Sequence, residues 1–202
     1  MPEIDFKEKL PTAFYLNDTR YVAKKLIGKI LVKKETKTLY AGRIVETEAY
    51  KEKNDGAAHS FNGKTERNKV MFEQGGVLYV YFTYGAHFCC NVVTGKEGVG
   101  DAVLIRAVEP VKGIEKMVLN RYKHSLENKR ELYNLTSGPG KLCKAYNIIR
   151  EDNGINLTGD YIFIVDSKVK SKIVTATRIG IKKSVDLPWR FYLDKNPFVS
   201  RL

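Results

Sequence analysis

Cysteine and histidine are scarce in this sequence. Its 202 residues hold three of each, and none of them stands at the spacing of metal ligands. A small, odd set of cysteines (Cys89, Cys90 and Cys143) argues against a disulfide framework and indicates a reducing compartment. Cys89 and Cys90 are adjacent in a strand-like run, so their side chains point to opposite faces and make a poor metal pair. We expect both to be small buried core residues.

Long apolar runs are absent as well. No run approaches the ~20 residues that a membrane-spanning helix needs. The first ten residues, MPEIDFKEKL, are rich in charge and contain no apolar signal segment. We therefore expect an intracellular protein without a membrane partner.

Acidic residues are in deficit. Lysine and arginine total 35 against 23 aspartates and glutamates, which gives a formal net charge of +12 and a pI of about 9.5. This balance favours a polyanion, above all nucleic acid, as partner. Hydrophobic residues make up 43% of the chain, which is enough for a packed core and excludes a disordered basic tail. The length suits one domain, or at most two small ones.

The order of the predicted elements favours a mixed α+β domain with a largely antiparallel sheet. Strands dominate the middle of the chain and helices flank them, without the regular alternation of a parallel sheet. The polar segment 51–68 contains several turn residues and is predicted to be a long loop, which is often functional. Strands are predicted at 29–34, 38–50, 77–84, 87–93, 101–110 (ended by Pro110), 161–166 and 172–181. Helices are predicted at 20–28, capped by Thr19, at 112–122, and from Ser137-Gly138-Pro139 through about Tyr146, with Ser137 as the cap.

Two glutamates stand inside the predicted strand 38–50. A period of two residues places Glu46, Glu48 and Tyr50 on one face of this strand. The opposite face is largely apolar, which places the strand inside the fold, where unpaired glutamates are rare. One interpretation is a general base that deprotonates a water, or a carboxylate pair that flanks a sugar bond. The other is a pair of ordinary salt bridges, which the strand by itself favours.

Arg106 is a candidate partner for these glutamates. It lies in the apolar run AVLIRAV and is predicted to be buried, where an arginine needs an anion. Either glutamate can supply that anion, in a structural pair or in one that keeps a general base ionised. His59, at the end of the polar loop, fits a capping or loop histidine better than a catalytic one on sequence alone.

Aromatic side chains cluster around the predicted turn at Gly85. Tyr79 and Tyr81 share one strand face, while Tyr84 lies beside the turn glycine. An exposed aromatic at a hairpin tip of a basic protein can stack on bases or wedge between them. Core filling is the competing interpretation, and it suits Tyr79 and Phe82 better than Tyr84.

Taken together, these segments resemble the alkyladenine (3-methyladenine) DNA glycosylase family. The resemblance covers nearly the whole chain in the family's order and spacing, so it is more specific than a single motif. It implies one DNA glycosylase domain over residues 1–202. The implied fold is a curved, largely antiparallel sheet flanked by helices, with a core like the formyltransferase C-terminal domain and a hairpin that protrudes toward DNA. The matching stretches are GRIVETEAY (42–50), AAHS (57–60), TERNKVMF (65–72), LYVYFTYG (78–85), FCCN (88–91), VLIRAVEP (103–110), SGPGKLC (137–143) and RFY (190–192).

The resemblance also implies a reaction. Members cut the N-glycosidic bond of damaged purines, alkylated or deaminated, in double-stranded DNA, without a metal or a diffusible cofactor. Glu48 matches the general base that activates water, and Arg106 matches the arginine that helps hold it. Lys141 in SGPGKLC is then a phosphate contact rather than a Schiff-base nucleophile, so we expect no lyase activity. We expect a monomer located with the DNA, in the cytoplasm or nucleoid, or in a nucleus if the source is eukaryotic.

The same resemblance implies how a lesion is recognised. Tyr50, His59 and Tyr81 match residues that sandwich and contact the flipped base. Tyr84 matches a tyrosine that enters the minor groove and fills the gap that the base leaves. Asn91 matches an asparagine that excludes undamaged guanine by a clash with its exocyclic amine. Extruding a base costs a few kcal/mol, and a wedge offsets part of this cost.

Two other function classes compete with this one. A nucleic-acid-binding module without catalysis, for example one that recognises RNA, would use the charge and the aromatics equally well and would leave Glu48 and Arg106 a structural role. A carbohydrate glycosidase would use Glu46 and Glu48 as its carboxylate pair. The net charge of +12 argues against the sugar hydrolase, because most sugars are neutral.

Overall fold

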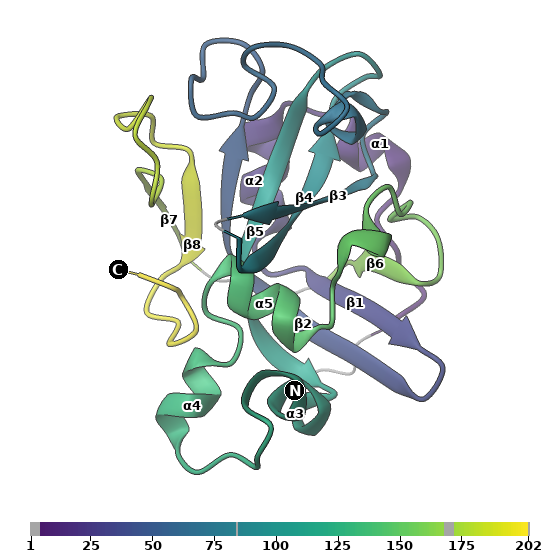
Figure 1. Ribbon diagram of the computed structural model, residues 1–202, viewed down its shortest axis with the longest axis vertical. Coiled ribbons are helices and arrows are strands. Elements are labelled where there is room, and N and C mark those ends of the chain that lie inside the picture. The colour runs from purple at the N-terminus through teal and green to yellow at the C-terminus, as the bar shows by residue number, and fades with distance from the viewer. Residues whose placement is uncertain (1–4, 84, 168–171, 202) are drawn as a thin grey trace.

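The computed structural model describes residues 5–83, 85–167 and 172–201, and its centre is one sheet of eight strands (Figure 1). The strands pair antiparallel in the order β3-β4-β5-β2-β1-β6, with β8 on β2 and β7 on β8. This confirms the predicted α+β class. The strands are β1 (Ile30–Glu35), β2 (Thr38–Tyr50), β3 (Leu78–Thr83), β4 (His87–Thr94), β5 (Asp101–Lys112), β6 (Ile162–Val165), β7 (Ile173–Ala176) and β8 (Arg190–Leu193).

The long strand β2 organises the sheet. One edge of β2 pairs with β5 from Ala41 to Tyr50. The other edge pairs first with β1, up to Arg43, and then with β8 at Glu46–Glu48. Two register shifts on either side of Glu46 bend the strand between these partners, as bulges do. The sheet therefore curls into a half-barrel, with both predicted glutamates at the bend.

Short helices cover the sheet and close the core. Helix α2 packs on β2 and β5, while α5 packs on β4 and β5 and also contacts α3. Their apolar side chains and the inner faces of the strands form the main hydrophobic cluster, in which Leu26, Ile105 and Leu142 are fully buried. The helical elements are α1 (Thr12–Tyr15), α2 (Thr19–Leu26), α3 (Ile114–Tyr122), α4 (Lys129–Asn134) and α5 (Pro139–Ala145), with 3₁₀ turns at Lys69–Phe72 and Arg150–Asp152.

Both predicted helix caps were wrong. The N-cap of α2 is Asp18, whose carboxylate accepts the N–H groups of Arg20 and Tyr21, whereas the hydroxyl of Thr19 donates to Asp101. At α5 the cap position is Gly138 and carries no side-chain cap. The predicted cap Ser137 instead forms a bridge to Ala107, because the segment before α5 lies against β5.

The ends of β5 and β7 differ most from the predicted strand boundaries. Pro110 does not end β5, which continues to Lys112, because Pro110 lies opposite Gly42 beside a register shift where no regular ladder bond is needed. Strand β7 is shorter than the predicted 172–181 and stops at Ala176. Residues 177–181 turn away toward the end of β2, held there by side-chain contacts described below.

Strands β3 and β4 form the predicted hairpin, with Tyr79 opposite Asn91 and Thr83 opposite His87. Tyr79 is buried, as expected. Phe82 is 38% exposed and packs on Phe88 at a centroid distance of 5.0 Å, so its prediction as a core residue was wrong. Its side chain points away from the face that carries Tyr79 and Tyr81. The proposed wedge, Tyr84, lies outside the described residues.

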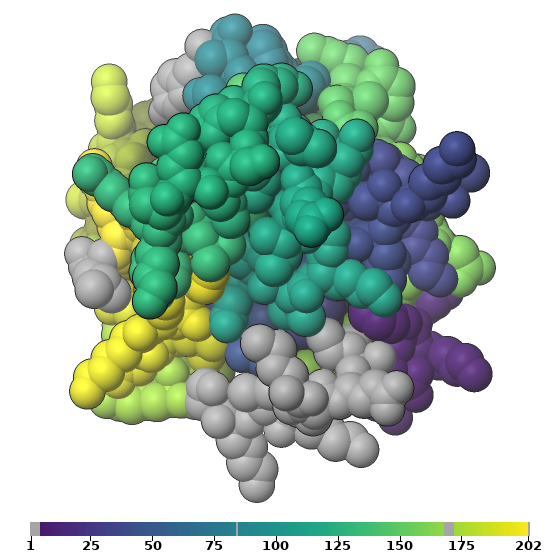
Figure 2. Space-filling model, turned by 90° about the horizontal axis from the view of Figure 1, so that it is seen from below, coloured from purple at the N-terminus to yellow at the C-terminus, as the bar shows by residue number. Residues whose placement is uncertain are grey.

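Helices α3 and α4 form the lower end of the molecule in Figure 1. Seen from below, their segment covers the centre of that face, between the C-terminal residues and the first two strands (Figure 2).

Within the part of the chain that the structure describes, no helix is long and apolar enough to cross a membrane. The three cysteines are buried and carry free thiols.

Candidate active site

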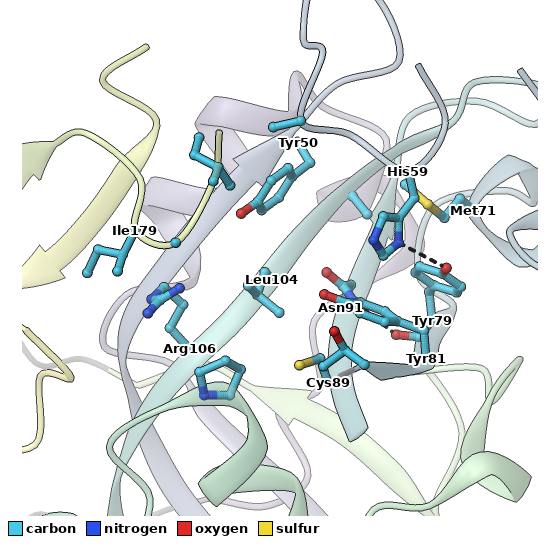
Figure 3. Close-up of a pocket in the computed structure, with 16 residues that line it drawn as sticks. Tyr50, His59, Met71, Tyr79, Tyr81, Cys89, Asn91, Leu104, Arg106 and Ile179 are labelled. Carbon is cyan, nitrogen blue, oxygen red and sulfur yellow. Dashed lines mark hydrogen bonds between the residues drawn. The ribbon is translucent and has the colours of Figure 1, made fainter. Parts of the chain in front are cut away.

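A cavity of about 370 Å³ opens where the ends of β2, β3, β4 and β5 meet the loop after β7. Small-molecule sites have volumes of about 300–1,000 Å³, so this one is large enough for a ligand. Figure 3 shows Tyr50 and Arg106 on one side and His59, Tyr79 and Tyr81 on the other. The lining residues are Tyr50, Ala57, His59, Met71, Tyr79, Tyr81, Thr83, Cys89, Asn91, Ala102, Leu104, Arg106, Pro139 and Ile179–Ile181.

Aromatic rings build the wall on the hairpin side. The rings of Tyr79 and Tyr81 stack with centroids 5.5 Å apart. The ring of His59 meets Tyr81 edge to face at 4.4 Å, and its Nδ1 lies 3.3 Å from the hydroxyl of Tyr79. These contacts hold flat, electron-rich surfaces in place before any ligand arrives.

The carboxylate of Glu48 lies directly behind the opposite wall. Its Oε2 accepts hydrogen bonds from the hydroxyl of Tyr50 at 2.8 Å and from Nη1 of Arg106 at 3.2 Å. Its Oε1 accepts the backbone N–H of Ile179 at 2.7 Å. Glu48 is fully buried, and all three donors line the cavity. A water that enters between these donors would meet a desolvated, oriented carboxylate.

Glu46 has a different set of partners. Its Oε1 accepts from Nε of Arg106 at 3.1 Å and from Nε of Arg190 at 2.9 Å, and its Oε2 accepts from the backbone N–H of Ser200 at 2.7 Å. Arg106 therefore bridges both glutamates, and its Nη2 also reaches Oγ of Ser200. Glu46 is fully buried and is not part of the cavity wall. This agrees with the structural interpretation for Glu46, a partner for basic side chains beside the site.

The two carboxylates determine the ionisation of their neighbours. Burial alone would lower the pKa of Arg106, but the charges of Glu48 and Glu46 outweigh it and raise that pKa above its ordinary value. Burial and the charge of Glu48 raise the pKa of Tyr50, so its hydroxyl stays protonated and remains a donor. Arg106 is therefore a permanent cation and Tyr50 a neutral hydrogen-bond donor beside the same oxygen.

The ionisable groups that line the hairpin side of the cavity are neutral at pH 7. Burial of its ring by the surrounding protein and the positive charge of Arg67 lower the pKa of His59, although the residue as a whole is exposed. Burial raises the pKa of Cys89 to about 11 and that of Tyr79 to about 12. Cys89 is buried as predicted, but it lines the cavity rather than the main core. This wall therefore offers neutral rings and a thiol to a ligand.

The structure brings most of the predicted site residues together. Tyr50, His59, Tyr81, Asn91 and Arg106 line one cavity, and Glu48 contacts two of them. Nδ2 of Asn91 donates to the backbone carbonyl of Tyr79 at 3.2 Å, which fixes the direction of the amide.

Lys141 lies apart from this cavity. Its Nζ donates to Asn134 at 2.8 Å, and burial and the charge of Arg121 lower its pKa. Only its neighbour Pro139 in helix α5 reaches the wall. A role of Lys141 in the chemistry at Glu48 is therefore not indicated, which leaves phosphate binding as the prediction for it.

Sequence reasoning missed the loop after β7. Ile179 supplies a donor to Glu48, and Arg178 forms a buried ion pair with Asp55. The stretch RIGI lies at the end of a run that reads as a strand, and nothing in its periodicity predicts that it leaves the sheet. The available signal was Arg178 itself, which stands directly before the apolar residues of IGI, because a buried arginine requires an anionic partner.

The arrangement suits acid–base chemistry on a flat ligand. A buried carboxylate held by an arginine can accept a proton from water, and the aromatic wall can stack on a planar ring. Among the described residues, no group of three or more histidine, cysteine or acidic side chains is arranged to hold a metal ion.

Comparisons with known proteins identify the family of this chain. A sequence model of the family described as "Methylpurine-DNA glycosylase (MPG)" matches residues 13–197. Three relatives carry the name "Putative 3-methyladenine DNA glycosylase". The protein from Alkaliphilus oremlandii is 50% identical over 96% of this chain and 99% of its own. That from Clostridium novyi is 47% identical over the same shares, and that from Francisella tularensis strain SCHU S4 is 50% identical over 89% and 92%. The chain therefore belongs to the methylpurine-DNA glycosylase family and is a DNA glycosylase, a hydrolase of N-glycosyl bonds.

Proposed function

We propose that this enzyme flips alkylated or deaminated purines out of duplex DNA and hydrolyses their N-glycosidic bond with a water that Glu48 activates. The observation that carries the proposal is the buried carboxylate of Glu48, held by three residues that line an aromatic cavity. The relatives are named for 3-methyladenine, which is a lesion of this class.

In this mechanism the water enters the gap beside Arg106 and Ile179. Glu48 takes a proton from it, the water oxygen bonds to the sugar C1′, and the electron pair of the breaking bond goes to the base nitrogen. The sugar is oxocarbenium-like in the transition state, and the negative charge of Glu48 stabilises it. The product is an abasic site. Lys141 does not line the cavity, which supports a monofunctional enzyme in which this lysine forms no Schiff base.

Recognition of the lesion then uses the opposite wall. A purine that carries a positive charge stacks on electron-rich rings in the manner of a cation–π contact. His59, Tyr79 and Tyr81 supply such rings and are neutral at pH 7, so they do not repel the charge. Asn91 projects from β4 into the same space, where it would oppose the exocyclic amine of guanine.

The protein binds the duplex through its positive surface, as a monomer. The β3–β4 hairpin enters the minor groove, with Tyr84 in the gap left by the flipped base and Lys141 on a phosphate. Phosphate contacts release counterions, so the affinity falls steeply as salt is added.

Release of bases from defined lesion duplexes tests this function. Duplexes with a single 3-methyladenine, 7-methylguanine, hypoxanthine or ethenoadenine are incubated with excess enzyme, and free base is measured by chromatography. We expect release of at least one alkylated purine far above the rate without enzyme. Binding of all four duplexes without release of any base would favour the non-catalytic nucleic-acid module instead.

Replacement of Tyr84 by alanine is expected to lower capture of the lesion. Without the wedge, the base stack closes again at a gain of a few kcal/mol, so the flipped state is less populated. We expect affinity for a lesion duplex to fall by about 10-fold or more, while affinity for an undamaged duplex stays within about twofold. Tyr21→Ala, at an exposed tyrosine on helix α2 and outside the hairpin, is the matched control. Equal affinity of Tyr84→Ala and the wild type for the lesion duplex would exclude the wedge role.

A further inference from the structure

A buried ion pair joins two loops beside the cavity. Arg178 and Asp55 are both fully excluded from solvent at their side chains. The guanidinium donates two parallel hydrogen bonds to the carboxylate, from Nη1 at 2.6 Å and from Nη2 at 2.7 Å. Such a fork fixes direction as well as distance. It connects the loop after β2 with the loop after β7.

Further hydrogen bonds tie the pair to both loops. Nη1 of Arg178 also donates to the carbonyl of Ala49 at 3.0 Å, and Nη2 donates to the carbonyl of Ser184 at 3.2 Å. The carboxylate of Asp55 also accepts the backbone N–H groups of Lys51 and Ala57. The pair is therefore the point at which the end of β2 and both loops are held together.

The flat face of the guanidinium carries a second set of contacts. It lies 4.6 Å from the ring centroid of Tyr50 and 5.3 Å from that of Trp189. Tyr50 is the residue whose hydroxyl donates to Glu48, and the next residue after Arg178 is Ile179, whose N–H donates to the other oxygen of Glu48. Two of the three donors to Glu48 thus depend on where Arg178 lies.

From this geometry we infer that Arg178, clamped by Asp55, is a positioning residue of the reaction: it holds Tyr50 and the N–H of Ile179 on the carboxylate of Glu48. It does not line the cavity, so it acts through these two neighbours and not on the DNA. The inference rests on the proposed role of Glu48. It extends the machinery to a residue pair whose charges sum to zero, so the pair adds no net charge beside the reacting bond.

Lysine cannot replace Arg178 in this role. It keeps the charge, but it loses the planar fork that matches a carboxylate and the flat face that stacks on Tyr50. A shift of about 1 Å at a catalytic group costs on the order of 100-fold in rate. For Arg178→Lys we expect a single-turnover rate of base release lowered by about 10- to 100-fold and affinity for a lesion duplex within about twofold of the wild type.

The experiment measures both quantities at a temperature where every variant is folded. Asp55→Asn removes the charge of the partner and is expected to lower the rate in the same direction. Asp152→Asn is the matched control, because Asp152 forms another strongly buried ion pair, with Lys33 at 2.9 Å, and neither residue lines the cavity. We expect Asp152→Asn to lower the melting temperature and to leave the rate within about twofold of the wild type.

Trp189 supplies an internal probe for the same variants. It is the only tryptophan in the sequence, and it lies against the guanidinium. Arg178→Lys should therefore change the tryptophan emission of the folded protein, whereas Asp152→Asn should not.

A folded Arg178→Lys variant with the wild-type rate would overturn the inference. It would also be overturned if Arg178→Lys and Asp152→Asn both lost rate in proportion to the fall in their melting temperatures. If Arg178→Lys does not fold, Asp55→Asn takes its place, and the same two outcomes for Asp55→Asn would overturn the inference. Failure of the proposed function has a different signature, because it would appear as full activity of Glu48→Gln.

Discussion

Glu48→Gln should abolish base release while leaving DNA binding intact. Removal of a general base costs about 10²- to 10⁴-fold in rate, and here the stabilising negative charge is lost with it. The side chain keeps its shape, so the wall of the cavity is preserved. All three neighbours of the carboxylate are donors, so the amide must turn its NH₂ toward one of them. We therefore expect a loss of about 1–3 kcal/mol in the free energy of unfolding as well.

Glu46→Gln is the matched control for this variant. It removes the same charge from the same arginine, at a buried position two residues away on the same strand. Its rate should fall far less, because Glu46 does not contact the residues that line the cavity apart from Arg106. Single-turnover release, equilibrium binding to a lesion duplex and thermal melts are measured for both variants and the wild type. Release at the wild-type rate by Glu48→Gln would refute the assignment.

Arg106→Met should have the largest effect on stability. It leaves two fully buried carboxylates without the cation that bridges them, and breaking a buried ion pair from one side costs about 3–5 kcal/mol. Base release should also fall by about 100-fold at temperatures where the variant is folded, because the water loses the donor that holds it. Urea unfolding measures the first effect and single-turnover release the second.

Arg43→Met provides the comparison for Arg106→Met. Arg43 pairs with Glu109 across the same two strands at 3.2 Å, the distance that also separates Arg106 from Glu48. The Arg43 pair is partly open to solvent, so its loss should cost no more than about 1 kcal/mol. Equal costs for the two variants would mean that burial does not set the strength of the Arg106 bridge.

Local patterns were sufficient to predict the sheet. The alternation in IVETEAY predicted a strand over 38–50, which is the observed extent of β2, and it placed Glu46, Glu48 and Tyr50 on one face. Contacts of both glutamates with Arg106, and of Tyr50 with Glu48, agree with that face. The apolar residues on both sides of Arg106 predicted that its side chain is buried, and it is. A side-chain period of two residues is a property of the strand itself.

Other features were beyond local patterns. Strand β8 was not predicted, because RFYL is too short to show a period. The cap of α2 was misassigned by one residue, since Asp18 and Thr19 are both good cap residues and the hydroxyl of Thr19 donates instead to Asp101. Phe82 is apolar, as core residues are, but it lies near the end of β3, where its side chain is exposed.

The sequence alone thus determined the fold class, the basic character of the surface and the strand face that carries the carboxylates, because each follows from composition or from a short period. Only the tertiary structure decided that Glu48 lies behind the cavity wall and that Glu46 forms ion pairs with Arg106 and Arg190. It also decided that Arg178 pairs with Asp55, 123 residues away, beside the cavity, and that Ile179 reaches Glu48 across 131 residues. Such pairings depend on how the half-barrel brings distant loops together, and no local periodicity encodes them.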